Sequence, residues 1–156
     1  KELVSHCNIP VISAGGVGCK ADIDKMLSYG AEGVSVGSPF IASVEADVTL
    51  EYKQACVEYG AQDIVVTERI SGTPCTVINT PYVQKIGTKQ TWLETVLNKN
   101  KKLKKWVKMI RFMIGTSAVT KAATQATYKT VWVAGPSIQH STEIGTVKSI
   151  VEKFVK

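Results

Sequence analysis

The chain has 156 residues, a formal net charge of +6 and 44% hydrophobic residues. That length fits a single domain, and that hydrophobic fraction is enough to build a real core. No apolar run approaches the roughly 18 residues that a membrane span needs, and nothing resembles a signal peptide. We therefore expect a cytoplasmic protein that does not enter a membrane.

The cysteines are scattered along the chain, at Cys7, Cys19, Cys56 and Cys75. They form no Cys-x-x-Cys pair and have no histidine partner at the spacing typical of zinc sites. We therefore expect reduced structural thiols, with neither disulfide bonds nor a metal site.

Residues 9–37 predict a β-α-β unit. The apolar run 11–14 lies between a proline and a glycine cluster, which is typical of a strand buried on both faces. Residues 21–29 have apolar side chains at helical spacing, and Gly30 follows them as a helix-ending glycine. Residues 33–36 form a second short apolar strand. The pattern places two parallel strands side by side, with both glycine turns at one edge of the sheet.

The two turns indicate a phosphate site. Gly15, Gly16 and Gly37 lack a Cβ atom, so their backbone amides allow close approach of an anion, and Ser38 adds a hydroxyl donor. Phosphate binds at this place in (β/α)₈ barrels, in the loops after strands 7 and 8. The alternative is that the glycines only tighten the turns, and the residues alone leave both interpretations open.

Four segments of the sequence carry a resemblance to a known family. They are Ile-Pro-Val-Ile-Ser-Ala-Gly-Gly-Val from residue 9, Gly-Ala-Glu-Gly-Val-Ser-Val-Gly-Ser-Pro-Phe from residue 30, Tyr-Lys-Gln-Ala from residue 52 and Val-Trp-Val-Ala-Gly-Pro-Ser-Ile from residue 131. In this order they resemble the nitronate monooxygenase (2-nitropropane dioxygenase) family. Flavin-dependent enoyl-ACP reductases share the first two.

The resemblance implies an α/β fold, namely the last two strands of a (β/α)₈ TIM barrel with a smaller, mostly helical lid domain. Such a barrel needs about 200 residues or more, so the chain is expected to be a C-terminal fragment of a longer enzyme. Residues 1–60 would hold the last barrel strands and the phosphate turns. Residues 61–130 would form the lid, and residues 131–156 would form a return loop and the C-terminal barrel helix.

The resemblance also implies the cofactor, FMN, and the residues that bind it. These are Gly15, Gly16, Ser35, Val36, Gly37, Ser38 and Ser137. Family members usually have Thr-Arg where this chain has Ser38-Pro39, and Gln where it has Pro136. The catalytic residues are unknown, because the family's histidine base lies in an upstream segment. That role is not transferred to His6 or His140.

The remaining elements follow from periodicity and turn residues. Residues 1–8 read as the end of a helix, and residues 49–59 predict a helix stopped by Gly60. Residues 63–70 and 75–78 are extended, and residues 144–154 predict a final amphipathic helix.

Residues 98–112 hold seven of the nineteen Lys and Arg residues. Apolar residues recur there at three- and four-residue steps, so we expect an amphipathic helix with a basic outer face. It could bind nucleic acid, an anionic membrane or a phosphorylated substrate. A solvated face on a lid helix is favoured, because no exposed aromatic residues interrupt the charges.

The leading hypothesis is an FMN-dependent oxidoreductase that oxidises alkyl nitronates with O₂. By resemblance, a base removes the proton next to the nitro group and the flavin takes the electron. The alternatives are an NADH-dependent enoyl-thioester reductase and a non-enzymatic basic binding module. No nucleic-acid or membrane partner is expected. The chain alone is expected to be inactive and to self-associate through exposed strand edges.

Overall fold

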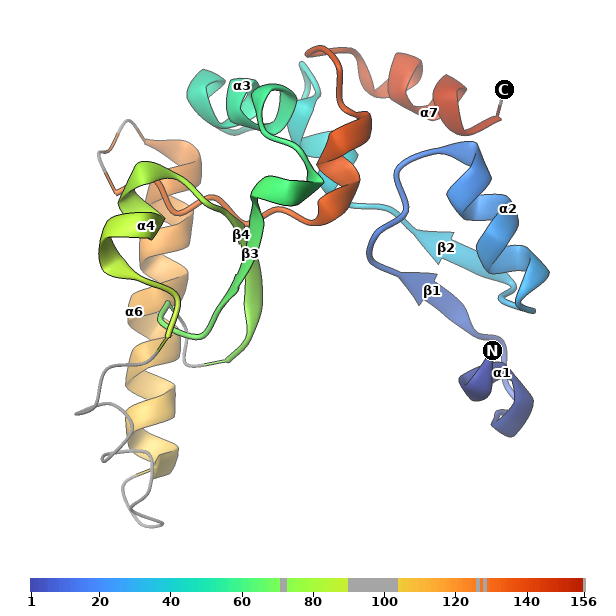
Figure 1. Ribbon diagram of the computed structural model, residues 1–156, viewed down its shortest axis with the longest axis horizontal. Helices are drawn as coiled ribbons and strands as arrows, with labels where there is room; N and C mark the ends of the chain where they lie inside the picture. Colours follow the sequence, from blue (N-terminus) through green and yellow to red (C-terminus); the bar gives the residue numbers. More distant parts are fainter. Residues whose placement is uncertain (71–72, 90–103, 126, 128, 156) are drawn as a thin grey trace. The chain divides into compact units, whose positions relative to one another are not determined.

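The computed structural model describes residues 1–70, 73–89, 104–125, 127 and 129–155 (Figure 1). Its contacts divide the chain into two compact units, one of residues 1–61 with 135–156 and the other of residues 62–134. The element order is α1 (Glu2–His6), β1 (Ile12–Ala14), α2 (Lys20–Ser28), β2 (Gly33–Ser35), η1 (Ser38–Ala42), α3 (Leu50–Glu58), η2 (Ala61–Asp63), β3 (Ile64–Thr67), β4 (Cys75–Ile78), α4 (Pro81–Ile86), α6 (Lys104–Thr124), η3 (Pro136–His140) and α7 (Val147–Val155), where η marks a 3₁₀ helix.

The first unit begins with the predicted β-α-β arrangement. Strands β1 and β2 pair in parallel, with Ile12 opposite Gly33 and Ala14 opposite Ser35, and α2 connects them. Helix α2 ends at Tyr29, and Gly30 follows with φ +89°, a conformation that L side chains rarely adopt. The β-α-β prediction is therefore confirmed, including its parallel strand order and its helix-ending glycine.

The prediction that the first strand is buried on both faces is wrong for the described residues. Ile12 is 58% exposed, and each strand has at least one exposed residue. The reason is that β1 and β2 form a two-stranded sheet, and no further described strand pairs with either of them. An apolar strand of a parallel sheet is buried only when neighbouring strands and helices cover it.

The rest of the first unit surrounds a small core. Helix α3 buries Tyr52, Ala55 and Cys56, and its N-cap residue Thr49 accepts a hydrogen bond from the Tyr52 amide. The amide of Val44 donates to the Gly145 carbonyl at 2.8 Å, which ties the end of η1 to the segment before α7. The predicted helices over 49–59 and 144–154 are thus found as α3 and α7, within a few residues of the expected ends.

The second unit is built on an antiparallel hairpin. Strands β3 and β4 pair with Ile64 opposite Ile78. The predicted extended segment 75–78 is confirmed, and the one over 63–70 is confirmed only over residues 64–67, because Asp63 ends η2 and residues 68–70 form a bend and a turn. Val77 also forms an antiparallel bridge with Val133. The core cluster consists of Val77, Val83, Ala122 and Val131. The hairpin, the helices α4 and α6 and the segment around residue 131 therefore share one core.

The helix predicted over the basic segment 98–112 is confirmed from residue 104 onward, as the first part of α6. Residues 98–103 lie outside the described residues, as do the side chains of all seven Lys and Arg residues of the segment 98–112. The premise that the segment has no exposed aromatic residues is wrong, because Trp106 and Phe112 are 62% and 57% exposed. Ile110 and Met113 are also more than half exposed. The core contacts of α6 come instead from its second half, through Ala122 and Val119.

Among the described helices, none combines the length and the apolar character needed to span a bilayer. Helix α6 is the longest of them, with 21 residues.

Candidate functional site

The two glycine turns of the first unit follow strands that end side by side. Since Ala14 pairs with Ser35, the chain leaves β1 at Gly15 and β2 at Val36 from the same edge of the sheet. Gly15 and Gly16 have φ of +88° and +74°, so both depend on the absence of a side chain. A Cβ atom built at either of them would meet no other atom within 4 Å.

The second turn is equally open. A Cβ atom at Gly37 would also meet nothing within 4 Å. Gly37 is the N-cap of η1, and Pro39 lies in the first turn of that helix, as expected for a residue without an amide proton. Ser35 is exposed at the end of β2 and Val36 is half-buried after it. These residues leave solvent-facing space beside the backbone of both turns.

Ser38 joins this turn to the return loop. Its hydroxyl oxygen accepts a hydrogen bond from the Gly135 amide at 2.8 Å, and Ser137 is buried two residues further on. The sequence assigned Ser38 and Ser137 to one site from regions far apart in the chain. The structure brings these two segments together through Gly135, which the sequence did not single out.

These residues fit an anion such as the phosphate of FMN. A phosphate needs backbone that it can approach closely and hydroxyl protons to bind. The open glycines Gly15, Gly16 and Gly37 satisfy the first requirement. Ser38 satisfies the second, because an oxygen that accepts from Gly135 still has its own proton to donate.

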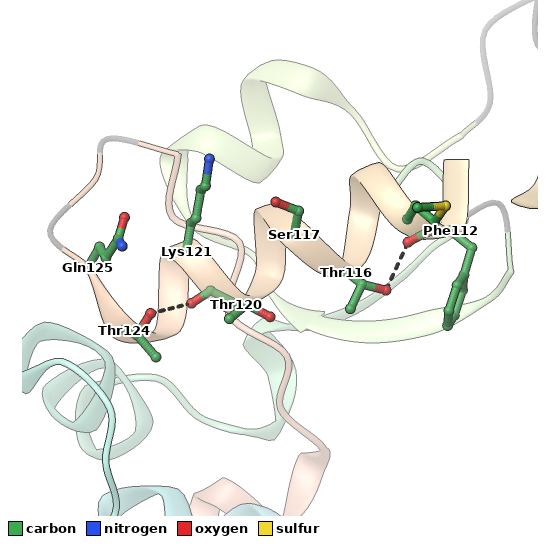
Figure 2. Close-up of a pocket in the computed structure, with 8 residues that line it drawn as sticks. Phe112, Thr116, Ser117, Thr120, Lys121, Thr124 and Gln125 are labelled. Carbon is green, nitrogen blue, oxygen red and sulfur yellow. Dashed lines mark hydrogen bonds between the residues drawn. The ribbon is translucent and has the colours of Figure 1, made fainter. Parts of the chain in front are cut away.

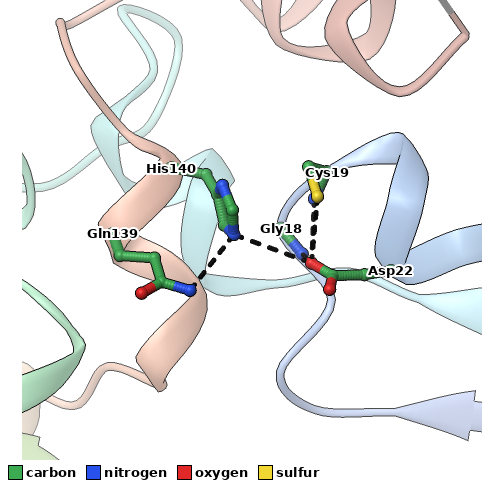
Figure 3. A network of polar contacts seen from close by, with 5 residues as sticks. All are labelled: Gly18, Cys19, Asp22, Gln139 and His140. Atoms are coloured by element: carbon green, nitrogen blue, oxygen red, sulfur yellow. Dashed lines mark hydrogen bonds and ion pairs between the residues drawn. The ribbon is translucent and has the colours of Figure 1, made fainter.

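A polar network lies at the start of α2, next to the first glycine turn (Figure 3). One carboxylate oxygen of Asp22 accepts from the amides of Gly18 and Cys19, at 2.9 and 3.2 Å, and from the Cys19 thiol at 3.3 Å. The same oxygen lies 3.7 Å from Nε2 of His140. The network therefore combines an N-terminal helix cap with a histidine from η3.

The network changes the acidity of Asp22. Its pKa lies below the ordinary value of 3.8, mainly because the Gly18 amide donates to the charged carboxylate. Partial burial opposes this shift, while the Cys19 thiol, the Cys19 amide and the charge of His140 act with the Gly18 amide. The carboxylate is therefore ionised at neutral pH.

Sequence reasoning missed this network. The cap itself has a signal, because Asp22 stands three residues after Cys19 at the position of a capping-box acid. The participation of His140 has no such signal, since it depends on how η3 packs against the first turn of α2. A histidine so distant in sequence has no spacing that would indicate this contact.

A concave region of about 570 Å³ lies along α6 in the other unit (Figure 2). Its described lining comes from α6 and from Gln125, the residue after it, and Lys121 is the only ionisable residue among these. Two of its hydroxyls are occupied by their own helix, because Thr116 donates to the Phe112 carbonyl and Thr124 to that of Thr120, both at 2.8 Å. The lining residues that the structure describes include no pair of groups that could perform acid–base chemistry.

Comparison with known proteins gives a match to the nitronate monooxygenase family model over residues 1–156. A probable nitronate monooxygenase of Staphylococcus saprophyticus is 34% identical over 86 residues, which are 55% of this chain and 24% of the relative. An indene-carboxyl-CoA dehydrogenase of Mycobacterium tuberculosis is 29% identical over 136 residues, which are 85% of this chain and 38% of the relative.

Solved structures agree in fold. FabK of Thermotoga maritima has a TM-score of 0.75 and 28% identity, and the match covers 99% of this chain and 45% of FabK. A nitroalkane oxidase of Streptomyces ansochromogenes matches with a TM-score of 0.67 at 18% identity, which shows the shared fold alone. The chain spans less than half the length of these relatives. Because the nitronate monooxygenase family model matches residues 1–156, which are the whole of this chain, the chain belongs to that family.

Proposed function

We propose that this chain is part of an FMN-dependent oxidoreductase that oxidises alkyl nitronates with O₂. The observation that supports this most is the pair of open glycine turns at one sheet edge, in a chain that matches the nitronate monooxygenase family throughout. Bound FMN would supply the electron-accepting chemistry. The residues of this chain would bind and orient it.

In this proposal, the amides around Gly15, Gly16 and Gly37 and the hydroxyl of Ser38 hold the FMN phosphate. Ser35 and Val36 lie at the end of β2 beside the site, and Ser137, buried two residues after Gly135, belongs to it from the return loop. In this proposal the phosphate-binding residues come from residues 1–60 and 131–156. The lid domain is formed by residues 61–130. The base and the stacking surface for the flavin ring would come from the part of the family fold that this chain does not span.

The test is an O₂-uptake assay on the native-length enzyme that contains this chain, with an alkyl nitronate as substrate. Turnover that depends on FMN supports the proposal. FMN-loaded enzyme that consumes no O₂ with any alkyl nitronate would overturn the proposed substrate, although not the phosphate site.

An enoyl-thioester reductase that uses NADH is the second candidate. Its thioester substrate class is supported by the Mycobacterium tuberculosis relative, which aligns with 85% of this chain and whose name is that of a dehydrogenase of a CoA thioester. Consumption of NADH with crotonyl thioester, in the absence of O₂ uptake with nitronates, would select this candidate. A basic binding module over residues 98–112 would instead show salt-dependent binding to DNA or anionic vesicles.

A further inference from the structure

We propose that Cys19, Asp22 and His140 form a binding site for a divalent transition-metal ion, with Zn²⁺ as the best match. This inference does not depend on the proposed flavin chemistry, and all three residues belong to the same compact unit.

The ligand atoms are of the right kinds and lie close enough together. The Cys19 sulfur, an Asp22 carboxylate oxygen and a His140 ring nitrogen all lie within 4.8 Å of one another. Zinc takes thiolate, imidazole and carboxylate ligands in tetrahedral geometry at roughly 2.0–2.3 Å, so its ligand atoms are about 3.3–3.7 Å apart. The sulfur–oxygen distance of 3.3 Å and the nitrogen–oxygen distance of 3.7 Å already match this separation.

The backbone fixes two of the three ligands. The Asp22 oxygen that lies near the Cys19 sulfur and Nε2 of His140 is the same oxygen that accepts from the Gly18 and Cys19 amides, so these amides hold the ligand atom in place. Cys19 is held as the N-cap of α2. Amide donors that orient a ligating carboxylate are typical of the outer shell of metal sites.

Gly18 allows the third ligand to approach. A Cβ atom at Gly18 would collide with Cδ2 of His140 and would lie 2.9 Å from the Ser137 carbonyl oxygen. Only glycine therefore lets η3 bring the imidazole against the start of α2. Gly18 is a positioning residue for His140 in this proposal.

A small cavity adjoins one of the three ligands, His140. It has a volume of about 20 Å³, and its lining includes Gly18, His140, Ser141 and the cation Lys153, but neither Cys19 nor Asp22. The hydroxyl oxygen of Ser141 is buried without a hydrogen-bond partner among the described residues, and the residue is 9% exposed. The cavity has room for about one water molecule. A water in this cavity would satisfy Ser141 beside the His140 ligand. Three protein ligands leave the fourth position of a tetrahedral zinc site for a solvent molecule.

The competing explanation is that the network only caps α2. In that case Asp22 and Cys19 satisfy the first amides of the helix, and His140 is a surface ion-pair partner. Gln139 separates the two explanations. Its amide nitrogen lies 3.2 Å from Nε2 of His140, where it competes with a metal for the same nitrogen.

The experiment is a titration of the purified, reduced protein with Co²⁺, followed by displacement with Zn²⁺ in competition with a chromophoric chelator. We expect one tightly bound ion, with the visible bands of tetrahedral Co²⁺ and a thiolate-to-metal charge-transfer band. Cys19→Ser and His140→Ala should each weaken Zn²⁺ binding at least about tenfold. Cys19→Ser should also abolish the charge-transfer band, and His140→Ala should shift the visible bands. Gln139→Ala should bind at least as tightly as the wild type.

The matched controls are Cys7→Ser and His6→Ala, which remove an exposed thiol and an exposed imidazole outside the cluster. Both should bind like the wild type. Circular dichroism of each variant establishes that it is folded, and Cys19→Ser keeps a capping hydroxyl at the start of α2. The proposal would be overturned if the wild type showed no charge-transfer band. It would also be overturned if Cys7→Ser lost the band while Cys19→Ser kept it.

Discussion

The Gly135 amide donates a hydrogen bond of 2.8 Å to the Ser38 hydroxyl oxygen, and this bond joins positions 97 residues apart in sequence. It links the turn after β2 to the loop that leads into η3. A Cβ atom at Gly135 would lie 3.2 Å from the same oxygen, so the contact is tight on both sides. The proposed phosphate site therefore depends on a long-range contact as well as on the β-α-β unit.

Ser38→Ala should lower the free energy of unfolding by about 1 kcal/mol, because the partly buried Gly135 amide loses its acceptor. Ser38→Thr should retain most of the stability, since it keeps the hydroxyl. Urea unfolding measures both. Ser28→Ala is the control, because the Ser28 hydroxyl is exposed and bonds only to the Lys25 carbonyl within its own helix. If Ser38→Ala and Ser28→Ala lose equal stability, the long-range bond has no special role.

Gly37→Asp should weaken FMN binding by the native-length enzyme, because it places a carboxylate where the phosphate would rest. The space beside Gly37 is open and its φ is −123°, so the substitution should not disturb the fold. Gly37→Asn adds nearly the same bulk without the charge, and should retain more flavin than Gly37→Asp. The flavin content of the purified variants measures this effect. Equal flavin content in wild type and Gly37→Asp would place the phosphate elsewhere.

The cysteines should differ widely in reactivity toward a thiol reagent at pH 8. Burial raises the pKa of Cys56 to about 12, so this thiol is protonated as well as shielded. Cys7 is exposed and should react first. Mass spectrometry after timed labelling should find Cys7 modified early and Cys56 modified only after denaturation. Early labelling of Cys56 in the folded protein would contradict the buried position of α3.

Asp22 should contribute to stability at neutral pH and lose this contribution in acid. Its pKa is lower in the folded chain than in the unfolded chain, so its contribution is complete above the unfolded value of 3.8. The contribution disappears as the pH falls further, through the folded value. Asp22→Asn should therefore unfold at lower urea than the wild type at pH 7, and the gap should narrow below pH about 3.8. Asp24→Asn, an exposed change on the same helix, is the control and should unfold at nearly the same urea concentration as the wild type at pH 7.

The sequence predicted the elements of the first unit well because their signals are local. Gly30 ends α2 through its backbone conformation, and the glycines after β1 adopt the left-handed turn that only they tolerate easily. The parallel pairing of β1 with β2 follows from one helix between two short apolar strands. Periodicity and turn residues suffice for this much.

The features that the sequence did not predict share a different cause. Each of them depends on contacts between segments that are far apart in the chain. The burial expected for β1 fails at Ile12 because burial requires neighbouring strands, and an apolar run does not provide them. The contact of His140 with Asp22 depends on the close approach of η3 at Gly18, and no spacing in the sequence encodes it. The bond between Ser38 and Gly135 was missed in the same way, although both segments had been assigned to one site.

The most direct test of the central claim compares FMN with riboflavin, which lacks the phosphate, as ligands of the native-length apoprotein. Titrations followed by flavin fluorescence give both dissociation constants. If the turns at Gly15, Gly16, Gly37 and Ser38 hold the phosphate, FMN should bind at least tenfold more tightly, a difference of about 1.4 kcal/mol. Equal affinities for FMN and riboflavin would contradict the phosphate site, and with it the function proposed for these residues.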